Sequence, residues 1–193
     1  MPAYEDLNPK TISNTKKFNK ISLSDPQMKT PDGFIRLSGP IEHDNIVNGD
    51  GLRAVIWTQG CRQSCPGCQN PETWDETAGI LVSIKEVKEI LRSFRGQKGL
   101  TFCGGEPLLQ AKACKEIATW AKQELKWDIW SFTGLIYEKV KAKQGPEWEF
   151  IKELNALIDG PYIQAQRDLT MKFRGSQNQR ILYLDNGEIT REE

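Results

Sequence analysis

From residue 52 onward, short apolar segments alternate with segments of helical periodicity. The expected strands cover residues 52–58, 100–103, 129–133, 156–159 and 181–184. One of the helical segments between them begins with a capping-box pattern, in which Ser83 is followed three residues later by Glu86. Alternation of this kind is typical of a parallel sheet with right-handed helical crossovers. The sequence therefore predicts an α/β fold.

The length of the chain limits how such a sheet can close. The chain has 193 residues, and residues 1–33 are polar and rich in Lys, Asn, Ser and Pro. We expect these residues to form a disordered N-terminal extension that ends in a turn at 31–33. The rest, residues 34–193, is shorter than the roughly 250 residues of a closed eight-fold barrel. We therefore predict one domain with a partial, open βα barrel of parallel strands.

Charge and hydropathy exclude several classes of partner. Lys plus Arg number 26 and Asp plus Glu also number 26, so nothing favours broad binding to nucleic acid or a membrane surface. No apolar run approaches the roughly 18 residues that span a bilayer. The first twenty residues are polar and do not resemble a secretory signal. We expect a cytoplasmic protein with no nucleic-acid or membrane partner.

Three of the five cysteines lie within eight residues, directly after the first expected core strand. Cys61, Cys65 and Cys68 form a Cys-x3-Cys-x2-Cys pattern. In a reducing compartment this pattern favours metal ligation or redox chemistry over disulfides. A 4Fe–4S cluster normally takes one thiolate on each of four irons, so three close cysteines leave one iron open to a small ligand. His43 is the only histidine, which leaves a histidine-based zinc hydrolase or a Ser-His-Asp triad at most one imidazole.

Two other interpretations of the cysteines stay open. Structural zinc takes four ligands, usually as two separated pairs, and Cys65 with Cys68 supplies only one such pair. A plain electron-transfer cluster needs a fourth thiolate, which Cys103 could supply. Otherwise Cys103 and Cys114 fit the pattern of small buried hydrophobic residues.

Two glycine-containing turns follow the next two expected strands. Gly-Gly-Glu-Pro occupies residues 104–107, and Thr-Gly occupies residues 133–134. Ligands of parallel sheets bind at the carboxyl ends of the strands. We therefore expect both turns and the cysteines to meet at one edge of the sheet.

The cysteine spacing with a downstream Gly-Gly-Glu-Pro resembles the radical S-adenosylmethionine (SAM) superfamily. More narrowly, the chain resembles the activating proteins of anaerobic ribonucleoside-triphosphate reductase over residues 35–184. The segments that carry the closer resemblance are 48–53, 70–74, 158–162 and 174–180. Two positions depart from the family pattern. Gln69 stands where an aromatic residue is frequent, and Cys103 stands where serine is common.

The resemblance implies a set of cofactor contacts. The three clustered cysteines would hold a 4Fe–4S cluster, and the amine and carboxylate of SAM would chelate its open iron. The residues implied in binding SAM are Gly67, Cys68, Gln69, Gly104, Gly105 and Glu106. The first three would lie against the adenine, the two turn glycines would let the backbone approach the ligand, and the glutamate would accept a hydrogen bond from the methionyl ammonium. The Thr-Gly turn is a further candidate for ribose or methionyl contact.

The resemblance also implies a reaction. The reduced cluster would pass an electron to the sulfonium of SAM, which would give methionine and a 5′-deoxyadenosyl radical. This radical would remove a hydrogen from a glycine of the reductase, with a flavodoxin- or ferredoxin-type protein as electron donor. No catalytic side chain is implied beyond the cluster and the cofactor. The alternatives are a radical SAM enzyme that acts on a small molecule, such as a deazapurine synthase, and a non-catalytic 4Fe–4S electron carrier.

Overall fold

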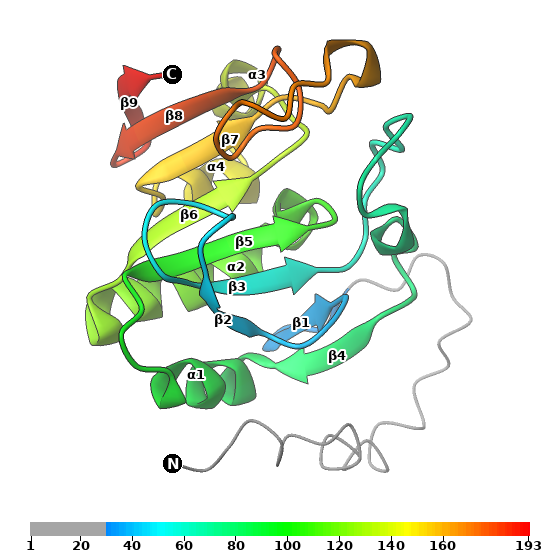
Figure 1. The fold of residues 1–193 in the computed structure, drawn as a ribbon. Helices are drawn as coiled ribbons and strands as arrows, with labels where there is room; N and C mark the ends of the chain where they lie inside the picture. The colour runs from blue at the N-terminus through cyan, green and yellow to red at the C-terminus, as the bar shows by residue number, and fades with distance from the viewer. Residues whose placement is uncertain (1–29) are drawn as a thin grey trace.

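The computed structural model describes residues 30–193 and contains one open, nine-stranded sheet (Figure 1). The strands are β1 (Phe34–Leu37), β2 (Glu42–Asn45), β3 (Arg53–Thr58), β4 (Ile80–Ser83), β5 (Gly99–Gly104), β6 (Asp128–Phe132), β7 (Ala156–Asp159), β8 (Arg180–Asp185) and β9 (Glu188–Glu192). The helices are α1 (Ile84–Ser93), α2 (Ala111–Trp120), α3 (Tyr137–Lys143) and α4 (Pro146–Ile151), with a π-helical turn at Ala121–Leu125. The strand order is β4-β1-β3-β5-β6-β7-β8-β9, and β2 pairs with β3.

The sheet has a parallel centre and antiparallel flanks. Strands β3, β5, β6 and β7 pair in parallel. Strands β1, β2 and β4 on one side, and β8 and β9 on the other, pair antiparallel with their neighbours. The predicted α/β class and open sheet are confirmed. The predicted parallel strands form only the centre of a mixed sheet, and the described strands do not close into a barrel, since the strand order runs from β4 at one edge to β9 at the other.

The connections explain the antiparallel flanks. A parallel pair needs a crossover of a dozen or more residues, usually a helix. Residues 38–41 and 46–52, which join β1 to β2 and β2 to β3, are too short for such a crossover. Residues 160–179, which join β7 to β8, are long enough but contain only the short 3-10 helix Gln164–Gln166. The chain therefore returns beside β7 in the opposite direction.

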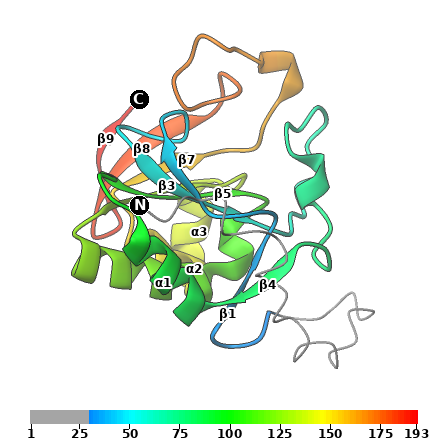
Figure 2. The ribbon, with the colours of Figure 1, turned by 60° about the horizontal axis from the view of Figure 1, so that its bottom comes forward.

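The four helices pack on one face of the sheet and enclose the main core (Figure 2). Alternate side chains of the central strands point to this face and are fully buried, among them Ala54, Ile56, Leu100 and Phe102. Helix α1 begins where the capping pattern predicts, because the Oγ of Ser83 accepts a hydrogen bond from the Glu86 N–H at 3.1 Å.

The opposite face is covered by loops. A smaller apolar cluster lies here, formed by Trp130, Ala156, Ile158 and Ile181. The segments 46–52 and 161–179 run across this face in Figure 1. Arg53 is fully buried beneath the first segment, with an Nη1 atom 2.6 Å from Asp128 and its guanidinium 5.1 Å from the centre of the Trp130 ring. The face of the sheet that carries no helix is therefore shielded from solvent by side chains of the loops and the strands.

The predicted disordered extension falls on residues 1–33, and residues 1–29 lie outside the described part of the chain. Its last residues form the predicted turn, since the Phe34 N–H donates to the carbonyl of Pro31 at 3.1 Å. Within residues 30–193, no helix is long and apolar enough to cross a membrane.

Candidate functional site

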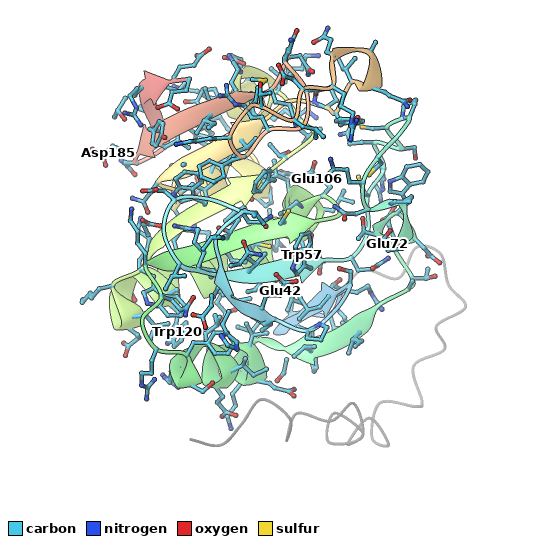
Figure 3. All side chains as sticks on the ribbon, in the orientation of Figure 1. Glu42, Trp57, Glu72, Glu106, Trp120 and Asp185 are labelled. Carbon is cyan, nitrogen blue, oxygen red and sulfur yellow. The ribbon has the colours of Figure 1, made fainter. Side chains whose placement is uncertain are left out.

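The carboxyl ends of β3, β5 and β6 meet at one edge of the sheet. Strand β3 leads into the cysteine loop, residues 60–70, β5 leads into the Gly-Gly-Glu turn, and β6 leads into the Thr-Gly turn. The N–H groups of Gly105 and Glu106 donate to the carbonyls of Thr58 and Gly60, both at 2.8 Å. The turn after β5 is therefore bound directly to the start of the cysteine loop. Figure 3 labels Glu106 at this edge.

This contact explains the paired glycines of the turn. A Cβ on Gly105 would overlap with the carbonyl oxygen of Gly60, and one on Gly104 would lie 2.6 Å from the carbonyl oxygen of Thr58. Gly104 also has a φ of +97°, which favours glycine. The two glycines allow a close approach to the chain's own backbone, whereas the resemblance implied an approach to the ligand.

The cysteine loop carries three free thiols that are all half-buried. The Cys68 N–H donates to the carbonyl of Cys65 at 3.0 Å, which closes a tight turn through Gly67 at a φ of +74°. The sulfur of Cys68 accepts a hydrogen bond from the Asn70 N–H at 3.4 Å. The loop therefore holds its thiols in a defined backbone conformation.

The charges of this edge interact with one another. Burial raises the pKa of the Cys61 thiol, and the Gln63 N–H opposes that rise. The negative charges of Glu106, Cys65 and Cys68 raise the same pKa further. Cys61 therefore lies within electrostatic reach of the other two thiols and of the glutamate, as their places at one sheet edge predict.

Glu106 is a buried carboxylate with neutral partners only. Only 3% of the surface of Glu106 is exposed to solvent. Its Oε1 accepts hydrogen bonds from the Thr133 hydroxyl at 2.9 Å and the Leu108 N–H at 3.1 Å, and its Oε2 accepts one from the Gly134 N–H at 2.8 Å. Burial raises its pKa, while these three hydrogen bonds lower it. A buried carboxylate with no cationic partner among residues 30–193 fits a place where a cationic ligand binds.

Gln63, which was not predicted as a site residue, also belongs to this edge. A Cβ on Gly134 would lie 2.8 Å from the Cγ of Gln63 and 3.6 Å from the Oε2 of Glu106. The Gln63 side chain therefore lies over the Thr-Gly turn, next to the buried carboxylate. Its place between the first two cysteines was the one feature of the sequence that could have pointed to it.

A second loop, residues 161–179, reaches the cysteine loop. A Cβ on Gly67 would lie 2.8 Å from the Cδ of Gln164. A cavity of about 530 Å³ opens between the two loops and is lined by Pro66, Tyr162, Ile163, Gln164 and Ala165. Two of the family-like segments anchor this loop at its base. The Asn178 side chain donates to the carbonyl of Pro161 at 2.7 Å, and the Gln179 side chain donates to that of Gly160 at 3.1 Å.

The other two cysteines lie in different surroundings. Cys103 is buried on β5, where its sulfur accepts a hydrogen bond from the Asn48 side chain at 3.4 Å and burial raises its pKa to about 12. Cys114 is fully buried in the main core on α2. Both match the interpretation as small buried residues.

The donor set fits a cluster better than a single metal ion. Among residues 30–193, no three His, Cys, Asp or Glu side chains converge to hold one ion. A zinc site needs four ligands at about 2.0–2.3 Å from one atom, whereas each thiolate of a 4Fe–4S cluster binds a different iron. Three free thiols on one loop, beside an unpaired carboxylate, suit a cluster with one open iron and a cationic ligand.

Comparison with known proteins agrees with this site. The family model described as "4Fe-4S single cluster domain" matches residues 47–182. The anaerobic ribonucleoside-triphosphate reductase-activating protein of Enterobacteria phage T4 is 34% identical over 71% of this chain and 87% of its own length. The proteins of the same name from Haemophilus influenzae and Escherichia coli K12 are 32% and 29% identical, and 91% and 94% of their lengths are covered.

Among solved structures, the crystal structure of QueE from Escherichia coli matches 57% of each chain with a TM-score of 0.43 and 14% identity. The family match covers the cysteine loop and both turns at the carboxyl edge of the sheet. The relatives match 144 to 147 residues of this chain at an identity of up to 34%. The chain therefore belongs to the 4Fe–4S single cluster domain family and to the anaerobic ribonucleoside-triphosphate reductase-activating proteins.

Proposed function

We propose that this protein is a radical SAM enzyme that generates a glycyl radical on an anaerobic ribonucleoside-triphosphate reductase. The observation that carries the proposal is that a member of the activating-protein family brings its cysteine loop, its buried glutamate and its Thr-Gly turn together at one sheet edge. When bound, the reduced 4Fe–4S cluster and SAM supply the electron, the broken carbon–sulfur bond and the 5′-deoxyadenosyl radical that takes a hydrogen from a glycine.

In this proposal Cys61, Cys65 and Cys68 hold the cluster. Ligation requires the thiolate form of each cysteine. The positive charge of the irons offsets the repulsion that the neighbouring thiolates and Glu106 exert on Cys61. The loop supplies three ligands and leaves the fourth position to SAM.

Glu106 receives the methionyl ammonium of SAM. A carboxylate has about four acceptor sites, and three of those of Glu106 are occupied by protein donors. One acceptor site is left for an N–H of the ammonium, whose charge offsets that of the buried carboxylate. The other proposed contacts to SAM are made by Gly67, Cys68, Gln69, Gly104 and Gly105.

The same proposal includes the domain type, the electron donor and the location of the enzyme. Residues 34–193 form one radical SAM domain of the partial-barrel type, in which the open sheet edge admits a peptide loop of the reductase. A flavodoxin- or ferredoxin-type protein donates the electron, and the reaction takes place in the cytoplasm. The equal numbers of acidic and basic residues favour neither nucleic acid nor membrane as a partner.

The test is an anaerobic assay of the reconstituted, reduced protein with SAM and its cognate reductase. A glycyl-radical doublet in the electron paramagnetic resonance spectrum and parallel formation of 5′-deoxyadenosine are expected. Cleavage of SAM without a glycyl radical would favour the small-molecule alternative. No cleavage of SAM would favour the electron carrier.

A further inference from the structure

The two ends of the cysteine loop are hydrogen-bonded to each other. At the entry, the Gly60 N–H donates to the carbonyl of Thr73 at 2.8 Å, and the Cys61 N–H donates to that of Trp74 at 3.1 Å. The exit of the loop, residues 71–75, is thereby held beside the last residues that follow β3. We call these two backbone hydrogen bonds the ladder. The backbone of Cys61, the first cysteine, forms one of them.

Gln59 adds two bonds to the same ladder from its side chain. Its Nε2 donates to the carbonyl of Glu72 at 3.1 Å and to that of Asp75 at 2.7 Å. Gln59 is itself 4% exposed, so neither bond competes with bulk water. The Gln59 side chain therefore connects the residue that precedes the cysteine loop to two carbonyls of the segment that follows it.

The backbone of Gln59 is fixed from the other side. Its N–H donates to the carbonyl of Arg36 on β1 at 3.0 Å. Its carbonyl accepts a hydrogen bond at 3.0 Å from the side chain of Gln110, which also donates to the carbonyl of Arg36 at 2.8 Å. The backbone of Gln59 is thus hydrogen-bonded both to β1 and to the Gln110 side chain.

Apolar packing does not replace these bonds. A cavity of about 710 Å³ lies directly behind the loop entry, with Gln59, Gly60 and Arg62 in its lining. Because side chains of residues 30–193 do not fill this space, the position of Cys61 depends on the polar contacts of the ladder more than on packing within this part of the chain.

We propose that Gln59 is a positioning residue for the iron–sulfur cluster, which ties the entry of the cysteine loop to its exit and so fixes Cys61 against the other two ligands. The inference rests on the proposed ligation of the cluster by Cys61, Cys65 and Cys68. Gln59 acts through the loop backbone and touches neither the cluster nor SAM. Without the tether, the loop opens toward the cavity and water reaches the cluster.

The test compares Gln59→Leu with Gln97→Leu. Gln97 is a matched control, because it is also buried and its Nε2 also donates two hydrogen bonds, to Asp44 at 2.6 Å and to the carbonyl of Arg95 at 3.0 Å. It precedes β5, at the end of the strand remote from the cysteine loop. Gln97→Leu also loses the bond that the Gln97 Oε1 accepts from the Asp44 N–H at 3.1 Å, so its general loss of stability should be at least as large as that of Gln59→Leu.

We expect the reconstituted Gln59→Leu protein to lose iron to a chelator about 10-fold faster than the wild type, which corresponds to about 1.4 kcal/mol. Its cluster potential should shift upward, since water stabilises the more negative reduced cluster. Gln97→Leu should match the wild type in both measurements. Equal rates of iron loss from the two variants would overturn the proposal.

If Gln59→Leu fails to fold, amide hydrogen exchange of the wild-type protein without its cluster provides a second test. The amides of Gly60 and Cys61 should exchange at least about 100-fold more slowly than the amide of Gly67, which lies within the open part of the loop. Equal exchange would show that the ladder does not hold the loop. Retention of the cluster by Cys61→Ala would instead reject the proposed ligation, and this exchange result would be unaffected.

Discussion

Two buried carboxylates at the same edge of the sheet have opposite surroundings. Asp159, at the end of β7, is fully buried and accepts hydrogen bonds from Arg180 at 2.9 and 2.6 Å and from the Tyr137 N–H at 2.9 Å. Glu106, after β5, is 3% exposed and accepts hydrogen bonds from neutral groups only. The charge of Asp159 is balanced by a cation of the fold itself, whereas the charge of Glu106 is available to a cationic ligand.

The paired carboxylate also accounts for part of the family resemblance. Arg180 joins Asp159 to Glu138 on α3, with distances of 3.1 and 3.0 Å to the glutamate oxygens. Residues 158–162 and 174–180 meet here, and their side-chain amides hold the base of the 161–179 loop. These two segments therefore build the base of the loop that lies beside the cysteine loop.

Substitution of the cluster ligands has the largest expected effect. Cys61→Ala, Cys65→Ala and Cys68→Ala should each abolish the cluster and the formation of 5′-deoxyadenosine, because a cluster normally needs every thiolate. Iron analysis and the visible absorbance after anaerobic reconstitution measure this loss. Cys103→Ala and Cys114→Ala serve as controls and should keep the cluster. Loss of the cluster in Cys103→Ala would show a closed, four-thiolate site instead.

Breaking the paired carboxylate should mainly affect stability. Arg180→Leu leaves Asp159 buried without its cation, which we expect to lower the free energy of unfolding by about 3 kcal/mol. Urea denaturation of the protein without its cluster measures the change. Arg174→Leu, in the same family-like segment but without an ion pair to a described residue, should cost less than about 0.5 kcal/mol. Weaker SAM binding by Arg180→Leu at unchanged stability would contradict the structural role.

Removing the unpaired carboxylate should mainly affect the ligand. Glu106→Ala should keep the cluster but weaken SAM binding by roughly 10- to 150-fold, since a hydrogen bond to a charged group contributes about 1.5–3 kcal/mol. Anaerobic calorimetry with the reconstituted protein measures the affinity. Glu42→Ala, which replaces a half-buried glutamate on β2, is the control and should bind SAM as the wild type does. Unchanged binding by Glu106→Ala would reject its proposed role.

The sequence predicted the parts of the molecule that depend on local apolar patterns. Strand β5 follows from its continuous apolar run, and α1 follows from its capping residue and periodicity. Strands β2 and β9 were missed because their residues are polar and largely exposed. Strand β4 was missed although it is mostly apolar, because it has only four residues and runs directly into α1. Helix α3 was missed because it is short and has no side-chain cap.

The same distinction applies to the candidate site. Cysteine spacing and the Gly-Gly-Glu turn are local patterns, so they could be recognised in the sequence. The place of Gln63 depends on its contact with Gly134, and the place of Gln59 depends on carbonyls of residues 72–75. Backbone carbonyls carry no residue type, so no pattern in the sequence identifies their partners.

The smallest expected effect is a pH dependence of opposite sign at the two carboxylate sites. The pKa of Glu106 is raised by burial, so between its unfolded value of about 4.3 and its folded value the folded state binds more protons than the unfolded state. The stability of the protein without its cluster should therefore fall as pH rises through this window, relative to Glu106→Gln. The pKa of Glu138 is lowered by its hydrogen bonds to Arg180, so its contribution should be lost as pH falls. Urea denaturation of the wild type, Glu106→Gln and Glu138→Gln, at pH values on both sides of about 4.3, measures both slopes, because the Glu106 window lies above the unfolded value and the Glu138 window lies below it. A wild type that gains stability over Glu106→Gln as pH rises would mean that Glu106 already has a cationic partner in the folded chain, and the unpaired carboxylate would no longer distinguish the ligand site from the structural one.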